Sequence, residues 1–131
     1  LIVEITETAV IRSIDEAIHF VTTIHDLGGR VAIDDFGAGF SSFRHLRSLR
    51  VDIVKIAGEF IERLPESPDD QAFVRALSEL AHHFGIEIVA EWVQDEATAA
   101  MLAGYGVQMV QGVLTGLAEP DGAARSSPLL G

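Results

Sequence analysis

Four apolar segments of this chain carry an ionisable residue near their downstream end, and a helix-like stretch follows each of them. The segments run over residues 1–7, 31–36, 51–56 and 86–91, and a shorter fifth one, over residues 107–111, ends in an amide. In a parallel sheet wrapped by helices both faces of each strand are buried, and ligands bind at the carboxyl ends of the strands. The recurrence of charge at one edge of such a sheet therefore predicts a functional site there.

The strand and helix signals alternate along the chain and predict an α/β fold. Five strands with four intervening helices fill the 131 residues, whereas a closed eight-stranded α/β barrel typically needs about 250. We therefore expect about the second half of a TIM-like (β/α) barrel, with five parallel strands and intervening helices. Because the chain begins at Leu1 inside a strand-like run, we expect it to be a fragment, whose unpaired edge strands would make it associate.

Capping residues and apolar periodicity predict where the helices lie. The first helix is expected to begin at Ser13 or Asp15 and to end near Leu27. A glycine-rich loop over residues 36–42 precedes a short helix that ends near Leu49. The loop is expected to lie at the carboxylate edge of the sheet.

Two further helices are predicted in the second half of the chain. One is expected over residues 69–84, and Asp95 is expected to cap another that ends near Ala103. The apolar face of the first of these is expected to comprise Ala72, Phe73, Ala76, Leu77, Leu80 and Ala81.

The composition indicates a folded domain and limits its partners. Hydrophobic residues make up 48% of the chain against 22% charged residues, far from the composition of disordered chains. The formal charge of -11 disfavours a nucleic-acid polymer or an anionic membrane as partner, since both require a basic surface. The absence of cysteine excludes disulfides and thiolate metal sites. A small phosphorylated ligand bridged by metal ions remains compatible with this charge.

The acids at the strand ends also have structural explanations. An Asp at such a position often forms a turn or caps a helix, so for Asp34 or Asp35 alone the structural role is an equal alternative. Glu4 differs, because it lies in a strand that is expected to be buried on both sides, where an unpaired carboxylate would be very costly. Glu4 should therefore have a metal ion or a cation as partner. Lys55 alone would be interpreted as a side chain that reaches solvent from a strand end.

Five short motifs at successive strand ends resemble those of the EAL-domain phosphodiesterases, which hydrolyse the bacterial messenger cyclic di-GMP. Residues 4–7 resemble the ExTE motif, residues 34–42 resemble DDFGxGxSS, and residues 52–56 resemble DxxKI. Ala90-Glu91 resembles the start of AEGVE, and Gln111-Gly112 resembles QG. The resemblance covers the carboxyl-terminal half of that domain. It implies that residues 1–120 belong to an EAL domain and that 121–131 form a loop or disordered tail.

The resemblance implies a metal-dependent hydrolysis of cyclic di-GMP to linear pGpG. Two Mg²⁺ or Mn²⁺ ions about 3.5 to 4 Å apart would neutralise the phosphoryl oxygens and supply hydroxide, and such hard ions take oxygen ligands. The implied metal ligands are Glu4, Asp34, Asp35 and Glu91. Asp35, Lys55 and Glu91 are the implied catalytic residues. Lys55 would position the nucleophile and phosphate, and Glu91 would alternatively accept a proton from the attacking water.

Two further residues receive roles from the same resemblance. Glu7 would brace the glycine loop that follows the Asp pair, and the family links this loop to metal binding and dimerisation. A homodimer through that loop is therefore expected. Gln111 would bind substrate. The expected location is the bacterial cytoplasm, either as such or as the cytoplasmic domain of a larger or membrane-anchored protein. No membrane contact by this segment is expected.

The chain departs from the family motifs at four positions. Ala57 replaces an Asp of the family motifs, Trp92 replaces a Gly, Gln94 replaces a Glu, and Val113 replaces an aromatic residue. Because the family's EAL Glu and an Asn ligand belong to strands upstream of Leu1, the fragment alone is expected to be inactive. The alternative function is a degenerate, non-catalytic EAL module that binds cyclic di-GMP or mediates protein contacts in signalling. A third alternative is another metal-dependent TIM-barrel enzyme.

Overall fold

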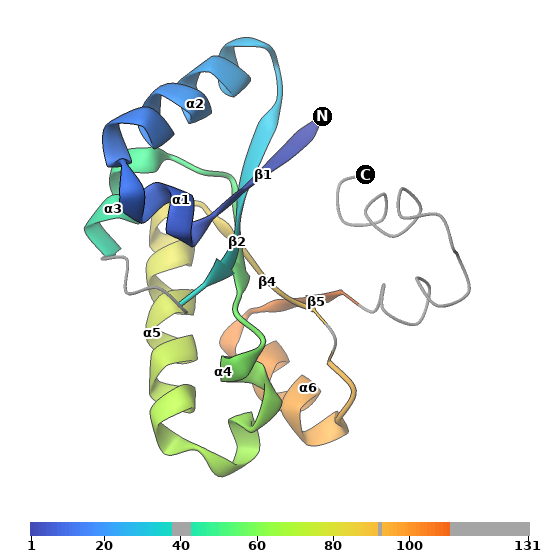
Figure 1. Cartoon of the computed structure of the whole chain (residues 1–131). Helices are drawn as coiled ribbons and strands as arrows, with labels where there is room; N and C mark the ends of the chain where they lie inside the picture. The colour runs from blue at the N-terminus through green and yellow to red at the C-terminus, as the bar shows by residue number, and fades with distance from the viewer. Residues whose placement is uncertain (38–42, 92, 111–131) are drawn as a thin grey trace, which may run out of the picture.

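The computed structural model describes residues 1–37, 43–91 and 93–110, and these form one parallel sheet covered by helices (Figure 1). The strands are hydrogen-bonded in the order in which they follow along the chain, which confirms the predicted succession of parallel strands. Their bounds are β1 Ile2–Thr6, β2 Arg30–Phe36, β3 Ile53–Ile56, β4 Glu87–Glu91 and β5 Gln108–Val110.

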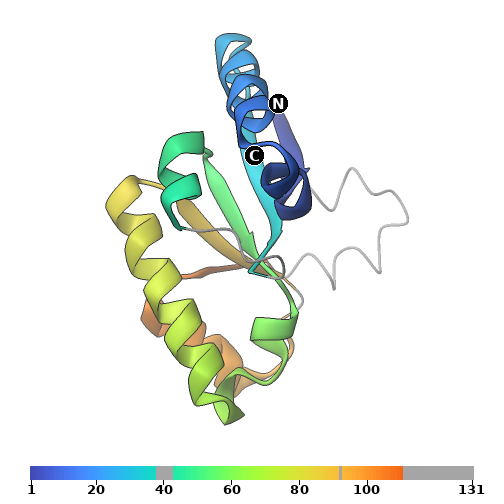
Figure 2. The ribbon, with the colours of Figure 1, turned by 60° about the vertical axis from the view of Figure 1, so that its left-hand side comes forward.

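Helical segments connect each strand to the next, and they pack against one face of the sheet (Figure 2). The bounds of these segments are α1 Glu7–Arg12, α2 Ile14–Asp26, α3 Phe43–Leu49, α4 Glu59–Glu62, the 3-10 helix η1 Leu64–Glu66, α5 Pro68–Phe84 and α6 Glu96–Tyr105. We call the helix-covered face of the sheet the outer face and the opposite face the inner face. This arrangement is that of part of a (β/α) barrel, as the sequence predicted.

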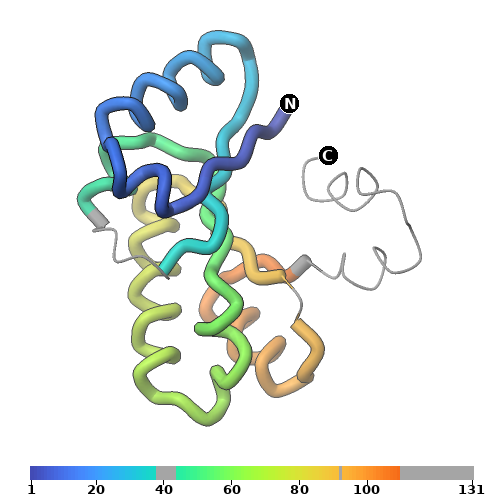
Figure 3. Tube along the Cα trace, viewed as in Figure 1, coloured from blue at the N-terminus to red at the C-terminus, as the bar shows by residue number. Residues whose placement is uncertain are grey.

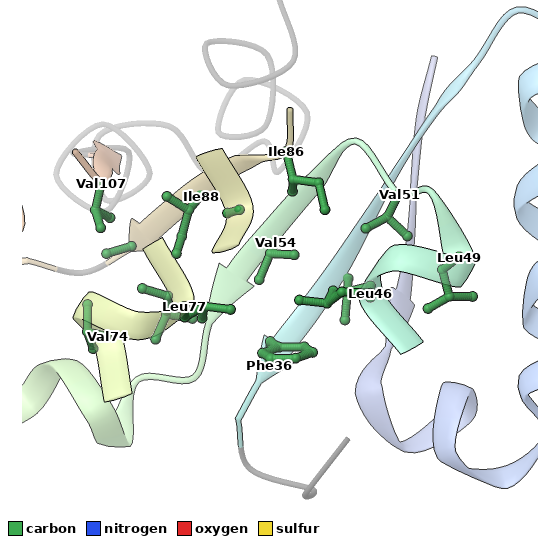
Figure 4. Close-up of a cluster of buried hydrophobic side chains, with 14 of the residues drawn as sticks. Phe36, Leu46, Leu49, Val51, Val54, Val74, Leu77, Ile86, Ile88 and Val107 are labelled. Atoms are coloured by element: carbon green, nitrogen blue, oxygen red, sulfur yellow. The ribbon is translucent and has the colours of Figure 1, made fainter. Parts of the chain in front are cut away.

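The main hydrophobic core lies between the outer face and the helices. Val54 of β3 and Ile88 of β4 are fully buried there, and Leu77 of α5 is directed at the strands that carry them (Figure 4). A second and much smaller cluster occupies the inner face, where Ala32, Ile53 and Val89 are buried. Because side chains alternate along a strand, β1 to β4 each contribute to both clusters.

The first helical region differs from its prediction. The sequence predicted one helix from Ser13 or Asp15, whereas the structure has a separate short helix, α1, before it. The Thr6 hydroxyl caps α1 by accepting a hydrogen bond from Ala9 N–H at 3.1 Å, and the Ser13 hydroxyl caps α2. Extended backbone at Ser13 separates the two helices, so the apolar periodicity of α2 does not continue into α1.

The apolar face predicted for α5 was wrong in part. Ala72 is exposed, and the fully buried positions of this helix are Val74, Leu77, Ser78 and Ala81, which follow the i, i+3, i+4, i+7 spacing of one helix face. A buried serine fits this face because its hydroxyl donates a hydrogen bond to the carbonyl oxygen of Tyr105 in α6. The contact with α6 therefore allows a polar residue on the buried face of α5, which hydrophobicity alone does not predict.

An irregularity near the end of β2 has a direct consequence for the site. Ile33 pairs with Val54 and Phe36 with Ile56, so β2 uses one residue more than β3 over this interval. Asp35 has a φ of 59°, in the left-handed region that Asp tolerates better than most residues. The extra residue of a bulge interrupts the alternation of side chains, so the residue after it faces the same side of the sheet as the residue three positions earlier. Phe36 therefore joins Ile33 in the outer core, while Asp34 stays on the inner face.

None of the helices in the described part of the chain combines the length and apolar character needed to cross a membrane.

Candidate functional site

Four adjacent strands each carry a charged side chain on the inner face near their carboxyl ends. Each charged residue stands two positions beyond an apolar residue of the small inner cluster, so it shares that residue's face. The pairs are Ile2 and Glu4 on β1, Ala32 and Asp34 on β2, Ile53 and Lys55 on β3, and Val89 and Glu91 on β4. The strand period thus brings four of the predicted site residues onto one surface.

Lys55 lies between two of the carboxylates. Its Nζ donates to Glu4 Oε2 at 2.5 Å and lies 3.3 Å from Glu91 Oε2, and its side chain is only 9% exposed. Burial alone would lower the pKa of the Lys55 ammonium, but the hydrogen bond to Glu4 and the nearby negative charges outweigh burial and raise it. Lys55 is therefore a permanent cation that joins the ends of β1, β3 and β4.

Asp34 faces the same group from β2. Burial, followed by repulsion from Glu4 and Glu91, raises the pKa of the Asp34 carboxyl, although Lys55 and a backbone hydrogen bond from Asp35 partly oppose this. We call Glu4, Asp34, Lys55 and Glu91 the inner-face charge cluster. It holds three carboxylates and one ammonium, so it carries an excess of negative charge.

The expectation that Glu4 is buried on both sides was wrong. The Glu4 side chain is 41% exposed, because β1 is an edge strand of the described sheet and pairs with β2 alone. The cationic partner that the sequence required for Glu4 is present as Lys55. An acid that is half exposed and already paired is available to a ligand at a lower cost than a fully buried one.

Asp35 and Glu7 lie beside the cluster. Asp35 follows Asp34 at the β2 bulge, where its side chain is exposed. Glu7, the first residue of α1, is only 2% exposed, and its Oε1 accepts a hydrogen bond from Gly37 N–H at 3.0 Å. The role of Asp35 as a metal ligand and catalytic residue and that of Glu7 in bracing the loop remain predictions, and Gln111 lies outside the described residues.

The positions that depart from the family motifs fall close to this edge. Ala57, directly after β3, is buried, and its N–H donates to Phe36 O at 2.9 Å. Gln94 is exposed, while Trp92 and Val113 lie outside the described part of the chain. Sequence reasoning missed the β2 bulge, for which the only local signal was the position of two Asp residues between Ile33 and Phe36.

The inner-face charge cluster is a candidate site for a divalent cation. Its carboxylate oxygens are the ligands that hard divalent ions prefer, and its excess negative charge favours such an ion. Within residues 1–37, 43–91 and 93–110, no three acidic or histidine side chains lie close enough together to hold one metal ion. Instead, Glu4 and Glu91 face Lys55. The donor chemistry of the cluster therefore fits a divalent cation, while two of its carboxylates are engaged with an ammonium group.

The chain is similar to known proteins in sequence and in structure. Cyclic di-GMP phosphodiesterase PdeB of Shewanella oneidensis is 37% identical over 89% of this chain, which corresponds to 14% of PdeB. A solved structure described as the PaMucR phosphodiesterase in complex with c-di-GMP has a TM-score of 0.78 and 34% identity, covering 83% of this chain and 44% of that one. The chain therefore spans less than half of either protein.

A second solved structure has a metal in its description. Klebsiella pneumoniae BlrP1, as a complex with manganese and cyclic di-GMP, has a TM-score of 0.76 and 31% identity, covering 82% of this chain and 27% of that one. The sequence model of the EAL domain matches residues 1–118. With five parallel strands, charged motif residues near the carboxyl ends of four of them and this match over most of its length, the chain belongs to the EAL domain family.

Proposed function

We propose that the protein containing this chain is a cyclic di-GMP phosphodiesterase that hydrolyses its substrate to linear pGpG with the help of divalent metal ions. The observation that carries the proposal is the inner-face charge cluster, where three carboxylates surround one ammonium at the carboxyl edge of the sheet. The activities stated for PdeB and PaMucR support the choice of substrate. A cyclic dinucleotide diester is anionic, so cations must accompany it to a site with this charge.

Glu4, Asp34 and Glu91, with Asp35 beside them, would hold the metal ions. Bound Mg²⁺ or Mn²⁺ would supply charge neutralisation at the phosphoryl oxygens and a hydroxide at neutral pH. Because Glu4 and Glu91 now face Lys55, at least one of them must exchange the ammonium for the metal ion. The freed ammonium of Lys55 would then be available to the substrate phosphate, which is the role that the resemblance to the EAL family implies for it.

The remaining expectations concern the larger protein. We infer that residues 1–120 are the carboxyl-terminal part of the EAL domain, with 121–131 as a tail, and that Gln111 binds substrate. Glu7 would brace the segment after Asp35, and a homodimer would form through that segment. The proposed location is the bacterial cytoplasm, in a protein whose other parts complete the barrel.

Turnover by the complete protein tests this function. Asp34→Asn should reduce Mn²⁺-dependent hydrolysis of cyclic di-GMP by at least about 100-fold, because it removes a charged ligand from the site without changing the shape of the side chain. Asp52→Asn, at the opposite edge of the sheet, should leave turnover within about twofold. Undiminished turnover in Asp34→Asn would remove Asp34 from the ligand set.

A second function, binding without turnover, is favoured by one observation. Ala57 is buried at the carboxyl end of β3, where the family motif has an Asp. If the natural protein binds cyclic di-GMP but does not hydrolyse it, and Ala57→Asp with Gln94→Glu restores hydrolysis, the chain is part of a degenerate EAL module. Rapid turnover by the natural protein, with no gain from these substitutions, would contradict that alternative.

A further inference from the structure

Gly37, directly after β2, is held from two sides. On one side the Glu7 carboxylate accepts a hydrogen bond from its N–H at 3.0 Å. On the other side stand the aromatic rings of Phe60 in α4 and Phe73 in α5. A Cβ added to Gly37 would lie 2.6 Å from Phe60 Cε2 and 3.0 Å from Phe73 Cζ, so the backbone at Gly37 directly contacts both rings.

The two rings form one surface. Phe60 and Phe73 stack with their centroids 4.4 Å apart and an interplanar angle of 28°. They come from separate helices, and Figure 3 traces the long stretch of chain that leads from the end of β2 to α4 and then to α5. Both residues pack against the main core, which fixes the position of the stack. We call Phe60 and Phe73 the aromatic seat of Gly37.

The backbone that rests on this seat has an uncommon conformation. Asp35 has a φ of 59° and Gly37 a φ of 109°, a value that only glycine adopts readily. Residues in such conformations persist only when the surrounding structure holds them in place. Among the described residues, the ladder between the ends of β2 and β3 closes with the bond from Ala57 N–H, directly after β3, to Phe36 O at 2.9 Å, and Gly37 lies beyond it. Glu7 and the aromatic seat provide contacts that hold the backbone at Gly37.

We propose that Phe60 and Phe73 are positioning residues, which press Gly37 against Glu7 and thereby fix the orientation of Asp34 and Asp35 at the carboxyl edge. The seat itself rests on the structure, and its effect on turnover rests on the proposed function. A structural role confined to packing α4 on α5 predicts a loss of stability without a local effect at Gly37. The positioning role and the packing role therefore differ in their effect on the amide of Gly37.

Phe84 gives a matched control. It lies on the same helix as Phe73, is also partly buried and packs against the same core, but it is located at the opposite end of α5, beside the amino-terminal edge of the sheet. Changing Phe60, Phe73 or Phe84 to Leu keeps an apolar side chain and removes the ring. A packing effect should therefore be similar in all three variants.

Amide hydrogen exchange at Gly37, followed by NMR in the complete protein, tests the seat without reference to activity. Phe60→Leu and Phe73→Leu should each accelerate exchange of the Gly37 N–H by about tenfold or more, because the bond to Glu7 opens more often. Phe84→Leu should change it by less than about twofold. Equal exchange at Gly37 in Phe73→Leu and Phe84→Leu would overturn the proposal.

Steady-state hydrolysis of cyclic di-GMP then tests the link to the site. The two seat variants should lower kcat by about tenfold with KM within about twofold, because misplaced carboxylates weaken transition-state contacts more than substrate binding. Phe84→Leu should keep its kcat. Faster exchange at Gly37 with an unchanged kcat would overturn the positioning role. Absence of turnover in the natural protein would contradict the proposed function, and the exchange experiment alone would then decide whether the aromatic seat holds Gly37.

Discussion

The two edges of the sheet carry their charges differently. At the amino-terminal edge two carboxylates each contact a side-chain nitrogen: Arg30 Nη2 lies 2.7 Å from Glu87 Oε1, and His25 Nε2 lies 2.9 Å from Asp52 Oδ2. Asp52 also accepts a hydrogen bond from Val31 N–H at 2.7 Å. These interactions link the ends of α2, β2, β3 and β4, and they give both carboxylates hydrogen-bonding partners.

At the carboxyl-terminal edge the charges do not balance. In the described part of the chain Glu4, Asp34 and Glu91 face one ammonium, that of Lys55, and burial together with repulsion from Glu4 and Glu91 raises the pKa of the Asp34 carboxyl. Lys55 offsets only part of this negative charge, and the repulsion that remains costs stability unless a further cation binds. The comparison indicates that the amino-terminal edge serves stability and the carboxyl-terminal edge serves function.

The largest expected difference between the edges concerns their cations. Lys55→Met should lower the free energy of unfolding of the complete metal-free protein by about 2 kcal/mol at pH 7, because Glu4, Asp34 and Glu91 then lose the ammonium that faces them. Arg30→Met should cost at most about 1 kcal/mol, since Arg30 and Glu87 are each about 40% exposed. Urea denaturation measures both values. Equal losses in the two variants would remove the distinction between the edges.

A smaller effect on stability, of opposite sign to that of Lys55→Met, is expected when Asp34 is replaced. A raised carboxyl pKa in the folded state means that its stabilising contribution is present at pH values below the unfolded pKa and is lost as the pH rises through the folded pKa. Asp34→Asn should therefore raise the Tm of the metal-free protein by about 2 °C at pH 7 and leave it unchanged near pH 3. Asp52→Asn should lower the Tm at pH 7, because Asp52 accepts two hydrogen bonds. A lower Tm in Asp34→Asn at pH 7 would contradict the repulsion.

Much of the fold followed from the sequence because local signals and tertiary contacts agree. The apolar segments that end in acids became parallel strands, and the strand period alone places Glu4, Asp34, Lys55 and Glu91 on one face. Gly85 ends α5 with a φ of 73°, as a glycine after a helix is expected to do. At these positions one physical rule was sufficient.

The remaining features depend on contacts between segments far apart in the chain. The β2 bulge at Asp35 shows only in the register with β3, and the burial of Ser78 depends on a carbonyl of α6. Likewise, no local pattern indicates that Phe60 and Phe73 meet at Gly37. The exposure of Glu4 follows from the place of β1 at the edge of the described sheet, whereas the apolar residues around Glu4 predict that it is buried.

Thermal unfolding of the complete protein with and without Mn²⁺ tests the central claim that the excess negative charge at the carboxyl-terminal edge binds a divalent cation. At about 100 times its Kd, a ligand of the folded state adds about 2.7 kcal/mol of stability, so Mn²⁺ should raise the Tm of the natural protein by several degrees. The same rise is expected in Asp52→Asn, whose substitution lies at the amino-terminal edge, and it should be largely lost in Asp34→Asn. A natural protein that Mn²⁺ does not stabilise, or an equal rise in Asp34→Asn, would contradict the account.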